Sequence, residues 1–327
     1  EEGGGPGARA PRRARSRGGM ARSSWPLVTS AYLAENSPSL KDGIDAREEA
    51  TYRWAYCEFI REAGRKLEVP QLTIATAVVF CHRFYATNSH KPRENDRHII
   101  ATAALFLAGK VEETPKMLRE VCFHTYVIKH KGDDAAAAAA RIKERDFFEQ
   151  YRETVLTAER ALLRALAFDF DVEHPYKHLV VAVKNLRKSD ESSLPNSLAQ
   201  VAWNFANDSL RTQLCLQFDA RHIACAVLYL AVKFNQQERP PEWYVRAFNL
   251  KEFPAKICED ASNQILDLYQ ASGGNRQLEQ LRRAPSSGQV AAAGTGAAPG
   301  APQQGSARPP PPPPPGQQAE RGAGGER

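Results

Sequence analysis

The chain has 327 residues, 42% hydrophobic and 25% charged, which is ordinary globular composition and enough for two domains. It contains no apolar run of the ~18 residues that a membrane span needs and no signal-peptide core near its start, so we expect a soluble, intracellular protein. The net charge of +6 comes from the two ends, because residues 24–272 hold one more acidic than basic residue. Weak contacts with nucleic acid or acidic surfaces are therefore expected only of the tails.

Both ends of the chain are predicted to be disordered. Residues 1–23 are rich in Gly and Arg, and residues 273–327 are rich in Pro, Gly, Ala and Gln, with seven consecutive prolines. Neither segment has enough bulky apolar side chains to offset chain entropy. The first methionine is Met20, directly after the Gly/Arg-rich stretch, which favours the interpretation of residues 1–19 as translated upstream sequence.

The residue types that usually build catalytic and metal centres are scattered. The six cysteines form no Cys-X-X-Cys pair and no Cys-His spacing suited to zinc, so we expect buried, reduced thiols. The histidines stand singly among the predicted helices. Glu112-Glu113 is interpreted as a solvated face or a local partner for Lys116, not as a pair of catalytic carboxylates. The sequence therefore predicts no metal, no cofactor and no catalytic residue.

Between about residues 45 and 270, apolar residues recur at helical spacing and strand-like alternation is scarce, which predicts an all-α fold. On the first predicted helix, Trp54, Phe59 and Ile60 are core candidates. The stretch 99–108 is apolar nearly all round, so we expect it at the centre of a bundle. The helices predicted in the first half cover about 46–66, 69–86, 96–112, a segment after Pro115, the alanine run 135–140, and 145–166.

The second half of the chain repeats the first. Arg97-His98-Ile99, followed by the apolar segment 105–111, returns as Arg221-His222-Ile223, followed by 228–234. Two copies of a helical domain explain this long period better than a stack of short repeats. Because Pro175 disfavours helix at the residue before it, the boundary is placed there. We predict two tandem five-helix bundles, over 24–172 and 173–272.

Several motifs occur in order along these bundles. They are the segment 106–113 (Phe-Leu-Ala-Gly-Lys-Val-Glu-Glu), Glu159 within 156–163, the segment 168–176 that ends at Pro175-Tyr176, and the stretches 71–77, 81–85 and 202–210. They resemble the cyclin box, so over residues 25–272 the chain is identified as a member of the cyclin family. It is most similar to cyclin T, particularly its plant and algal forms, with cyclins K and L as close relatives.

The resemblance implies a kinase-binding surface. In the family, a Lys and a Glu at the positions of Lys110 and Glu159 hydrogen-bond the kinase backbone beside its movable αC helix. The apolar neighbours implied for that surface are Leu107, Val111, Leu163 and Phe170. On pattern alone, Lys110 also fits a snorkelling lysine at a helix end and Glu159 an ordinary exposed carboxylate.

Gly109 is expected to belong to the same surface. A glycine inside a helix costs ~1 kcal/mol relative to Ala, so its presence calls for a reason, such as the close approach of another backbone. The second copy of the motif has Val232 at the equivalent position. The first copy is therefore the better candidate for the kinase face.

One departure from the family pattern narrows the class. Cell-cycle cyclins carry Met-Arg-Ala-Ile-Leu on the first helix, where it docks substrates. Aligned without a gap, this chain has the segment 52–56 (Tyr-Arg-Trp-Ala-Tyr), which retains only the Arg. This difference favours the transcriptional cyclins over the cell-cycle cyclins.

The resemblance implies a non-catalytic, nuclear subunit that activates a cyclin-dependent kinase of the transcription-elongation type. The substrate of the complex would be the C-terminal repeats of RNA polymerase II. A cyclin K- or L-type subunit of a splicing or transcription kinase is one alternative. A DNA-binding factor like transcription factor IIB is another, although the near-neutral core argues against it. An all-α enzyme is the third, but the sequence has no phosphate loop, metal cluster or nucleophile-base pair.

Overall fold

The computed structural model describes residues 25–91, 93–188 and 196–271. All of the described residues belong to a single compact unit. The predicted tails, 1–23 and 273–327, lie outside the described residues. The predicted boundary between 172 and 173 stays a prediction.

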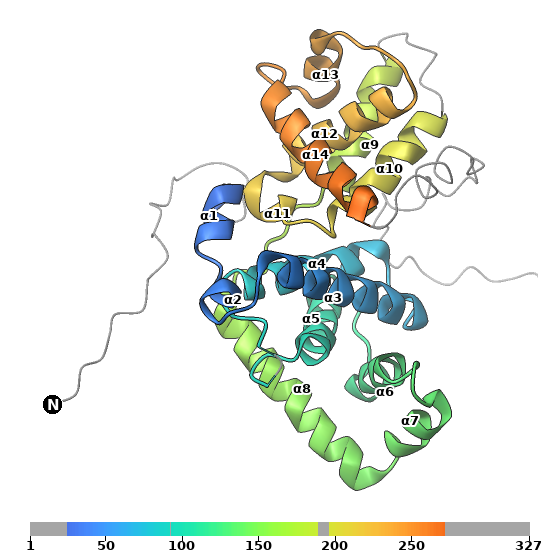
Figure 1. The fold of residues 1–327 in the computed structure, drawn as a ribbon. Helices are drawn as coiled ribbons and strands as arrows, with labels where there is room; N and C mark the ends of the chain where they lie inside the picture. Colours follow the sequence, from blue (N-terminus) through green and yellow to red (C-terminus); the bar gives the residue numbers. More distant parts are fainter. Residues whose placement is uncertain (1–24, 92, 189–195, 272–327) are drawn as a thin grey trace, which may run out of the picture. The chain divides into compact units, whose positions relative to one another are not determined.

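Every regular element among the described residues is a helix, and none of these residues lies in a strand, so the all-α prediction is confirmed (Figure 1). Two short helices, α1 (Ser30–Glu35) and α2 (Pro38–Lys41), precede the first bundle. The helices of the first bundle are α3 (Ala46–Lys66), α4 (Gln71–Tyr85), α5 (Arg97–Val111), α6 (Leu118–Lys129) and α8 (Arg145–Ala165), with the short α7 (Ala135–Arg141) between the last two. Those of the second are α9 (Pro175–Lys188), α10 (Asn196–Ser209), α12 (Ala220–Phe234), α13 (Pro241–Phe248) and α14 (Ala255–Ala271), with the short α11 (Leu214–Gln217) after α10.

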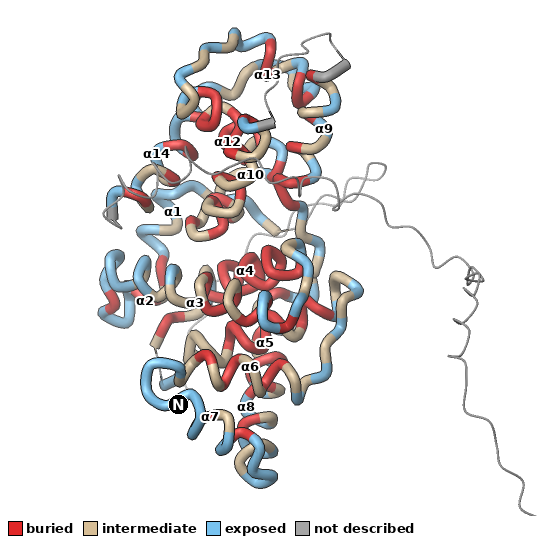
Figure 2. Tube along the Cα trace, turned by 90° about the vertical axis from the view of Figure 1, so that its right-hand side faces the viewer, coloured by how far each residue is buried: buried red, intermediate tan, exposed pale blue. Residues whose placement is uncertain are grey.

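The sequence repeat corresponds to the central helix of each bundle. Helix α5 packs on α3, α4, α6 and α8, and α12 packs on α9, α10, α13 and α14. Both helices begin at an aspartate that caps free backbone N–H groups: Asp96 accepts from His98 and Ile99, and Asp219 accepts from His222. Buried residues concentrate on α4, α5 and α12 (Figure 2).

One core candidate on α3 is wrong. Phe59 and Ile60 are buried, but Trp54 is 51% exposed. Trp54 lies two residues before the buried Tyr56. At 100° per residue, the Trp54 side chain is rotated by about 200° around the helix axis from Tyr56 and therefore lies on the opposite side of α3. The apolar character of Trp54 suggested a core position. The buried residues around it define the inner face of α3, and Trp54 lies on the solvent-exposed face.

Buried polar contacts join the two bundles. The carbonyl of Leu210 accepts from His82 Nε2 at 2.8 Å and from the thiol of Cys57 at 3.5 Å. Because burial lowers the pKa of His82 to about 3, the ring is neutral, so Nε2 donates and Nδ1 accepts from the Tyr56 hydroxyl at 2.6 Å. Arg83 donates to the carbonyls of the segment between the bundles, at Asp169 and Asp171.

A bilayer crossing requires a helix that is both long and apolar. Among the described residues, no helix combines the length and the apolar composition that such a crossing requires.

Candidate functional site

The two charged residues predicted to form the site meet where α5 packs on α8. Lys110 lies in the last turn of α5, Glu159 lies on α8, and Lys110 Nζ donates to Glu159 Oε1 at 2.7 Å. The Lys110 side chain is 45% exposed, whereas that of Glu159 is only 10% exposed. The carboxylate is therefore held inside the surface, and the ammonium covers it.

Lys110 has a second partner on its own helix. Its Nζ lies 3.9 Å from the ring centroid of Phe106, one turn earlier, in a cation-π contact. These contacts fix the position of the ammonium while nearly half of the side chain stays accessible. Since an ammonium has three donors, Lys110 can keep its bond to Glu159 and still donate to another acceptor.

The close backbone approach expected at Gly109 is present, and the approaching backbone is the chain's own. A Cβ at Gly109 would lie 3.2 Å from the carbonyl oxygen of Thr114 and 3.8 Å from Cα of Pro115. The chain returns so closely because Glu113 takes a left-handed conformation, with φ of 54°, and the Thr114 N–H donates to the Gly109 carbonyl at 2.8 Å. The turn after α5 thus explains the glycine without a partner, and a kinase contact at Gly109 stays a prediction.

The apolar residues of the predicted site divide into two groups. Leu107 is buried in the core of the first bundle, 5% exposed, and a kinase contact at Leu107 stays a prediction. Val111, Leu163 and Phe170 are half-buried and pack on the core from outside. These three can offer apolar surface to a partner beside the charged pair.

Phe168 is an exposed aromatic that the sequence reasoning missed. It is 65% exposed, and its ring lies edge-on to that of Phe170 with centroids 6.2 Å apart. Ala167 and Phe168 both have positive φ, 49° and 57°, so the end of α8 turns sharply and directs this side chain outward. The only signal in the sequence was the spacing of Phe168 and Phe170 around one polar residue, which does not say which ring is outside.

Glu112 has a different environment from the one predicted. Its Oε1 accepts from the Thr76 hydroxyl at 2.6 Å, and the same hydroxyl lies 2.8 Å from His174 Nε2. Burial lowers the pKa of His174 to about 4, so the neutral ring donates to Thr76, which in turn donates to the carboxylate. Glu112 therefore ties the end of α5 to α4 and to the start of the second bundle.

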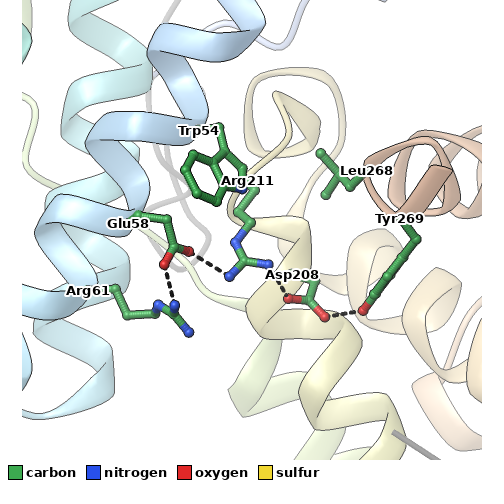
Figure 3. Close-up of a pocket in the computed structure, with 7 residues that line it drawn as sticks. All are labelled: Trp54, Glu58, Arg61, Asp208, Arg211, Leu268 and Tyr269. Atoms are coloured by element: carbon green, nitrogen blue, oxygen red, sulfur yellow. Dashed lines mark hydrogen bonds and ion pairs between the residues drawn. The ribbon is translucent and has the colours of Figure 1, made fainter. Parts of the chain in front are cut away.

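A small pocket lies between α3 of the first bundle and α10, Arg211 and α14 of the second (Figure 3). Arg211 pairs with Glu58 at 2.6 Å and with Asp208 at 3.0 Å, and Asp208 accepts from the Tyr269 hydroxyl. Burial raises the pKa of Asp208. The cavity has a volume of about 140 Å³, well below the ~300–1,000 Å³ of small-molecule sites. It is better understood as a gap beside an ion network that links the bundles.

The thiols are protected by burial. All six cysteines are free; Cys215 is half-buried and the others are buried. Burial raises the pKa of Cys122 and of Cys215 to about 12, so these thiols are protonated and poor nucleophiles near neutral pH. Within the described ranges, no three His, Cys, Asp or Glu side chains are grouped so as to hold a metal ion.

Two family models match the chain. One is described as the cyclin N-terminal domain and matches residues 29–171, and the other is described as the cyclin-T2-like C-terminal domain and matches residues 174–247. Together they span both bundles up to α13.

Similar curated proteins are also cyclins, of the T type. Cyclin-T1-3 of Oryza sativa subsp. japonica is 46% identical over 253 residues, which is 77% of this chain and 50% of the relative. Cyclin-T1-4 of Arabidopsis thaliana is 46% identical over 238 residues, 73% of this chain and 42% of the relative. The chain thus spans about half the length of these relatives. Putative cyclin-T1-1 of Arabidopsis thaliana is 38% identical over 74% of this chain and 92% of its own length.

Solved structures share the fold. The chain superposes on one from the yeast RNA Pol II CTD kinase CTDK-1 complex with a TM-score of 0.61 and 21% identity, covering 80% of this chain and 84% of that one. It superposes on one from the yeast TFIIK (Kin28/Ccl1/Tfb3) complex with a TM-score of 0.53 and 20% identity, covering 74% and 96%. At such identities the likeness concerns the fold.

Proposed function

Because this chain belongs to the cyclin family, we propose that it is the regulatory, non-catalytic subunit of a cyclin-dependent kinase of the transcription-elongation type. Its similarity to cyclin T proteins over about three quarters of its length supports this class. The substrate of the complex would be the C-terminal repeats of RNA polymerase II, which places the protein in the nucleus. The yeast complex that contains the similar chain is named as an RNA Pol II CTD kinase.

The observation that carries the proposal is the Lys110–Glu159 pair beside half-buried apolar side chains. A partner helix laid across α5 and α8 would find Val111, Leu163 and Phe170 as apolar surface, with the ammonium at its edge. The donors that Lys110 does not use on Glu159 can serve backbone carbonyls of the partner. Recognition of backbone tolerates variation in the partner's side chains.

The proposed mechanism is the stabilisation of one kinase conformation. A protein kinase needs its β3 lysine paired with the αC glutamate before the ATP phosphates are held correctly. A cyclin that binds the αC-in state preferentially shifts the kinase toward it. Moving a kinase from 1:99 to 99:1 active requires a differential affinity of about 5.5 kcal/mol. An apolar interface with an already positioned charged pair is a suitable source, because little side-chain freedom remains to be lost.

The test is reconstitution from purified components. A purified elongation-type kinase subunit is assayed on a peptide of RNA polymerase II C-terminal repeats, with and without this chain. The expected result is a complex on gel filtration and a rise in phosphate incorporation that depends on the chain. A chain that binds no kinase of this type, or that phosphorylates the peptide unaided, contradicts the proposal.

Two alternatives have distinct outcomes. A cyclin K- or L-type role would appear as preferential activation of the kinases that those cyclins serve. A role like that of transcription factor IIB would appear as DNA binding by residues 24–272, whose near-neutral charge disfavours it. Filter binding with that fragment separates this role from the cyclin role.

A further inference from the structure

Three cationic side chains at the start of α8 rest on aromatic rings instead of on carboxylates. Arg119 Cζ lies 5.5 Å from the centroid of Phe148, Arg141 Cζ lies 4.5 Å from that of Phe147, and Lys143 Nζ lies 5.6 Å from that of Phe123. All three cations are exposed, and all three rings are half-buried. We call these six residues the basic-aromatic surface.

The charges of this surface are not neutralised within the described part of the chain. Three other cations of the same bundle are paired: Lys129 with Asp96, Lys131 with Glu62, and Arg152 with Glu149. The cations of the basic-aromatic surface have no carboxylate within ion-pair distance among the described residues. Acidic residues do occur on the same elements, at Glu120, Glu144 and Asp146.

The aromatic supports hold the cations in place. A guanidinium or ammonium over an aromatic ring keeps its charge and most of its hydrogen-bond donors, while the ring limits its motion. The three rings in turn pack against the core of the first bundle. The result is a set of oriented, unneutralised cations contributed by α6, the end of α7 and the residues before α8.

This surface lies apart from the Lys110–Glu159 pair. Helices α6 and α7 lie at the end of α8 where that helix begins (Figure 1). Phe148 precedes Glu159 by eleven residues, which is about 16 Å along a helix axis. The two sites are therefore about three helical turns apart along α8.

We propose that the basic-aromatic surface binds a phosphorylated peptide segment. The inference rests on the proposed function, because the complex would produce phosphorylated repeats of its substrate. A phosphoserine carries about −1.5 to −2 charge and three strong acceptor oxygens, which match the fork of an arginine. Binding one phosphorylated repeat would keep the next repeat near the kinase and raise its effective concentration.

A peptide fits this surface better than single-stranded nucleic acid. Binding of single strands relies on free aromatic faces on which bases stack. Here each ring has a cation over it and packs against the core, so stacking would first have to displace the cation. Nucleic-acid binding is nevertheless a distinct outcome of the test.

The test measures fluorescence anisotropy with the full chain and no kinase. The probes are a labelled peptide with two Ser-Pro sites, both phosphorylated, the same peptide unphosphorylated, and a labelled oligouridine. The phosphorylated peptide should bind at least about tenfold tighter than the other two, because hydrogen bonds to charged groups are stronger than those between neutral groups. The variant Arg119→Gln/Arg141→Gln/Lys143→Gln should lose most of that difference.

The matched control is Lys66→Gln/Lys131→Gln/Arg152→Gln, which removes the same charge from the same bundle and should change phosphopeptide affinity less than twofold. Equal losses in both triple variants, equal affinity for both peptides, or a stronger preference for oligouridine would overturn the proposal. If the first triple variant loses helical content, Arg141→Gln alone, at the end of the short α7, replaces it. Failure of kinase activation would not affect this measurement, so the two proposals fail separately.

A second readout uses the complex. The triple variant should activate the kinase on a single-site peptide as the unmodified chain does. On a peptide with several repeats it should accumulate singly phosphorylated product. A normal multi-site pattern would overturn the proposal.

Discussion

Lys110 Nζ lies 2.7 Å from Glu159 Oε1, so the two residues implied for kinase recognition are paired with each other in the free chain. The pair is asymmetric, because the lysine is nearly half exposed and the glutamate is almost covered. Removing the lysine would leave a largely buried carboxylate without its counter-charge, which is strongly unfavourable. The pair therefore contributes to the stability of the free chain. A test of kinase recognition has to measure stability and kinase binding separately.

Exchange of the two charges achieves that separation. Lys110→Glu combined with Glu159→Lys restores an ion pair but reverses the charge offered to the kinase. Each single reversal should weaken kinase binding by ~2–5 kcal/mol, mostly through the dissociation rate. The exchanged variant should regain thermal stability but not kinase binding. Surface plasmon resonance and thermal unfolding measure the two effects, and an exchanged variant that dissociates like the unmodified chain would show that the residues serve only each other.

Substitution of Gly109 should destabilise the free chain. Its Cβ position is 3.2 Å from the Thr114 carbonyl, so Gly109→Leu has to displace the turn after α5. We expect a loss of ~1–3 kcal/mol in the free energy of unfolding, as for overpacked cores. Urea denaturation measures this loss. Gly132→Ala is the control, because a Cβ there meets nothing within 4 Å. A Gly109→Leu chain of unmodified stability that no longer binds kinase would instead place the glycine at the interface.

Periodicity and repetition in the sequence were sufficient to predict the main helices of the first bundle, the presence of two tandem bundles and the central position of α5. The helical phase of single side chains was harder to predict. Trp54 and Leu107 are both apolar residues in predicted helices, yet one is exposed and the other buried. Their positions depend on which face of the helix meets a neighbour, and that is a tertiary property.

For the candidate site, only a set of residue positions could be predicted from the sequence, and not the local geometry around them. The approach of Thr114 to Gly109 and the outward turn of Phe168 both depend on left-handed residues, Glu113 and Phe168 itself. Neither Glu nor Phe favours the left-handed conformation, so it could not be predicted from local sequence propensity. The cation-π contacts of the basic-aromatic surface join α6, α7 and α8, and no spacing within one helix could indicate them.

The predicted limits of the folded region can be tested by limited proteolysis. We expect a resistant fragment of about residues 24–272, because nearly all the apolar periodicity lies there. The contacts of Leu210 with His82 and Cys57 join the bundles and should protect the segment between them. Mass spectrometry of the fragments identifies the cleavage sites. A fragment that ends near Pro175 would show that the second bundle opens independently.

Phe168 should contribute to kinase binding and not to stability. Its ring is 65% exposed and its φ is 57°, a conformation that Asn adopts more readily than Phe. Phe168→Asn should leave the melting temperature unchanged or slightly raised, while kinase affinity falls about tenfold or more, as for an aromatic hot spot. Val181→Asn, at an exposed apolar position of α9, is the control. Equal affinities of the two variants would remove Phe168 from the interface.

The buried histidines should make the fold sensitive to mild acid. Burial lowers the pKa of His82 to about 3 and that of His174 to about 4, from the usual 6.5. At neutral pH the rings are uncharged in both states, so they add no pH dependence. As the pH falls below 6.5 the unfolded chain takes up protons that the folded chain does not, so stability decreases until the folded pKa is reached. For each ring the free energy of unfolding should fall by about 1.4 kcal/mol per pH unit, down to about pH 4 for His174 and further for His82.

Glutamine variants isolate this effect. In His82→Gln the side-chain amide can donate to the Leu210 carbonyl and its oxygen can accept from Tyr56, so the contacts between the bundles can be kept without a titrating ring. Urea denaturation at pH 5.5, 5.0 and 4.5 gives the slope of the free energy of unfolding against pH. His82→Gln should reduce that slope by about 1.4 kcal/mol per unit, and His82→Gln/His174→Gln by about twice as much. The doubled effect serves as the internal control, because a general loss of stability would lower the whole curve without changing its slope. An unchanged slope in both variants would mean that the acid sensitivity of the fold comes from other groups.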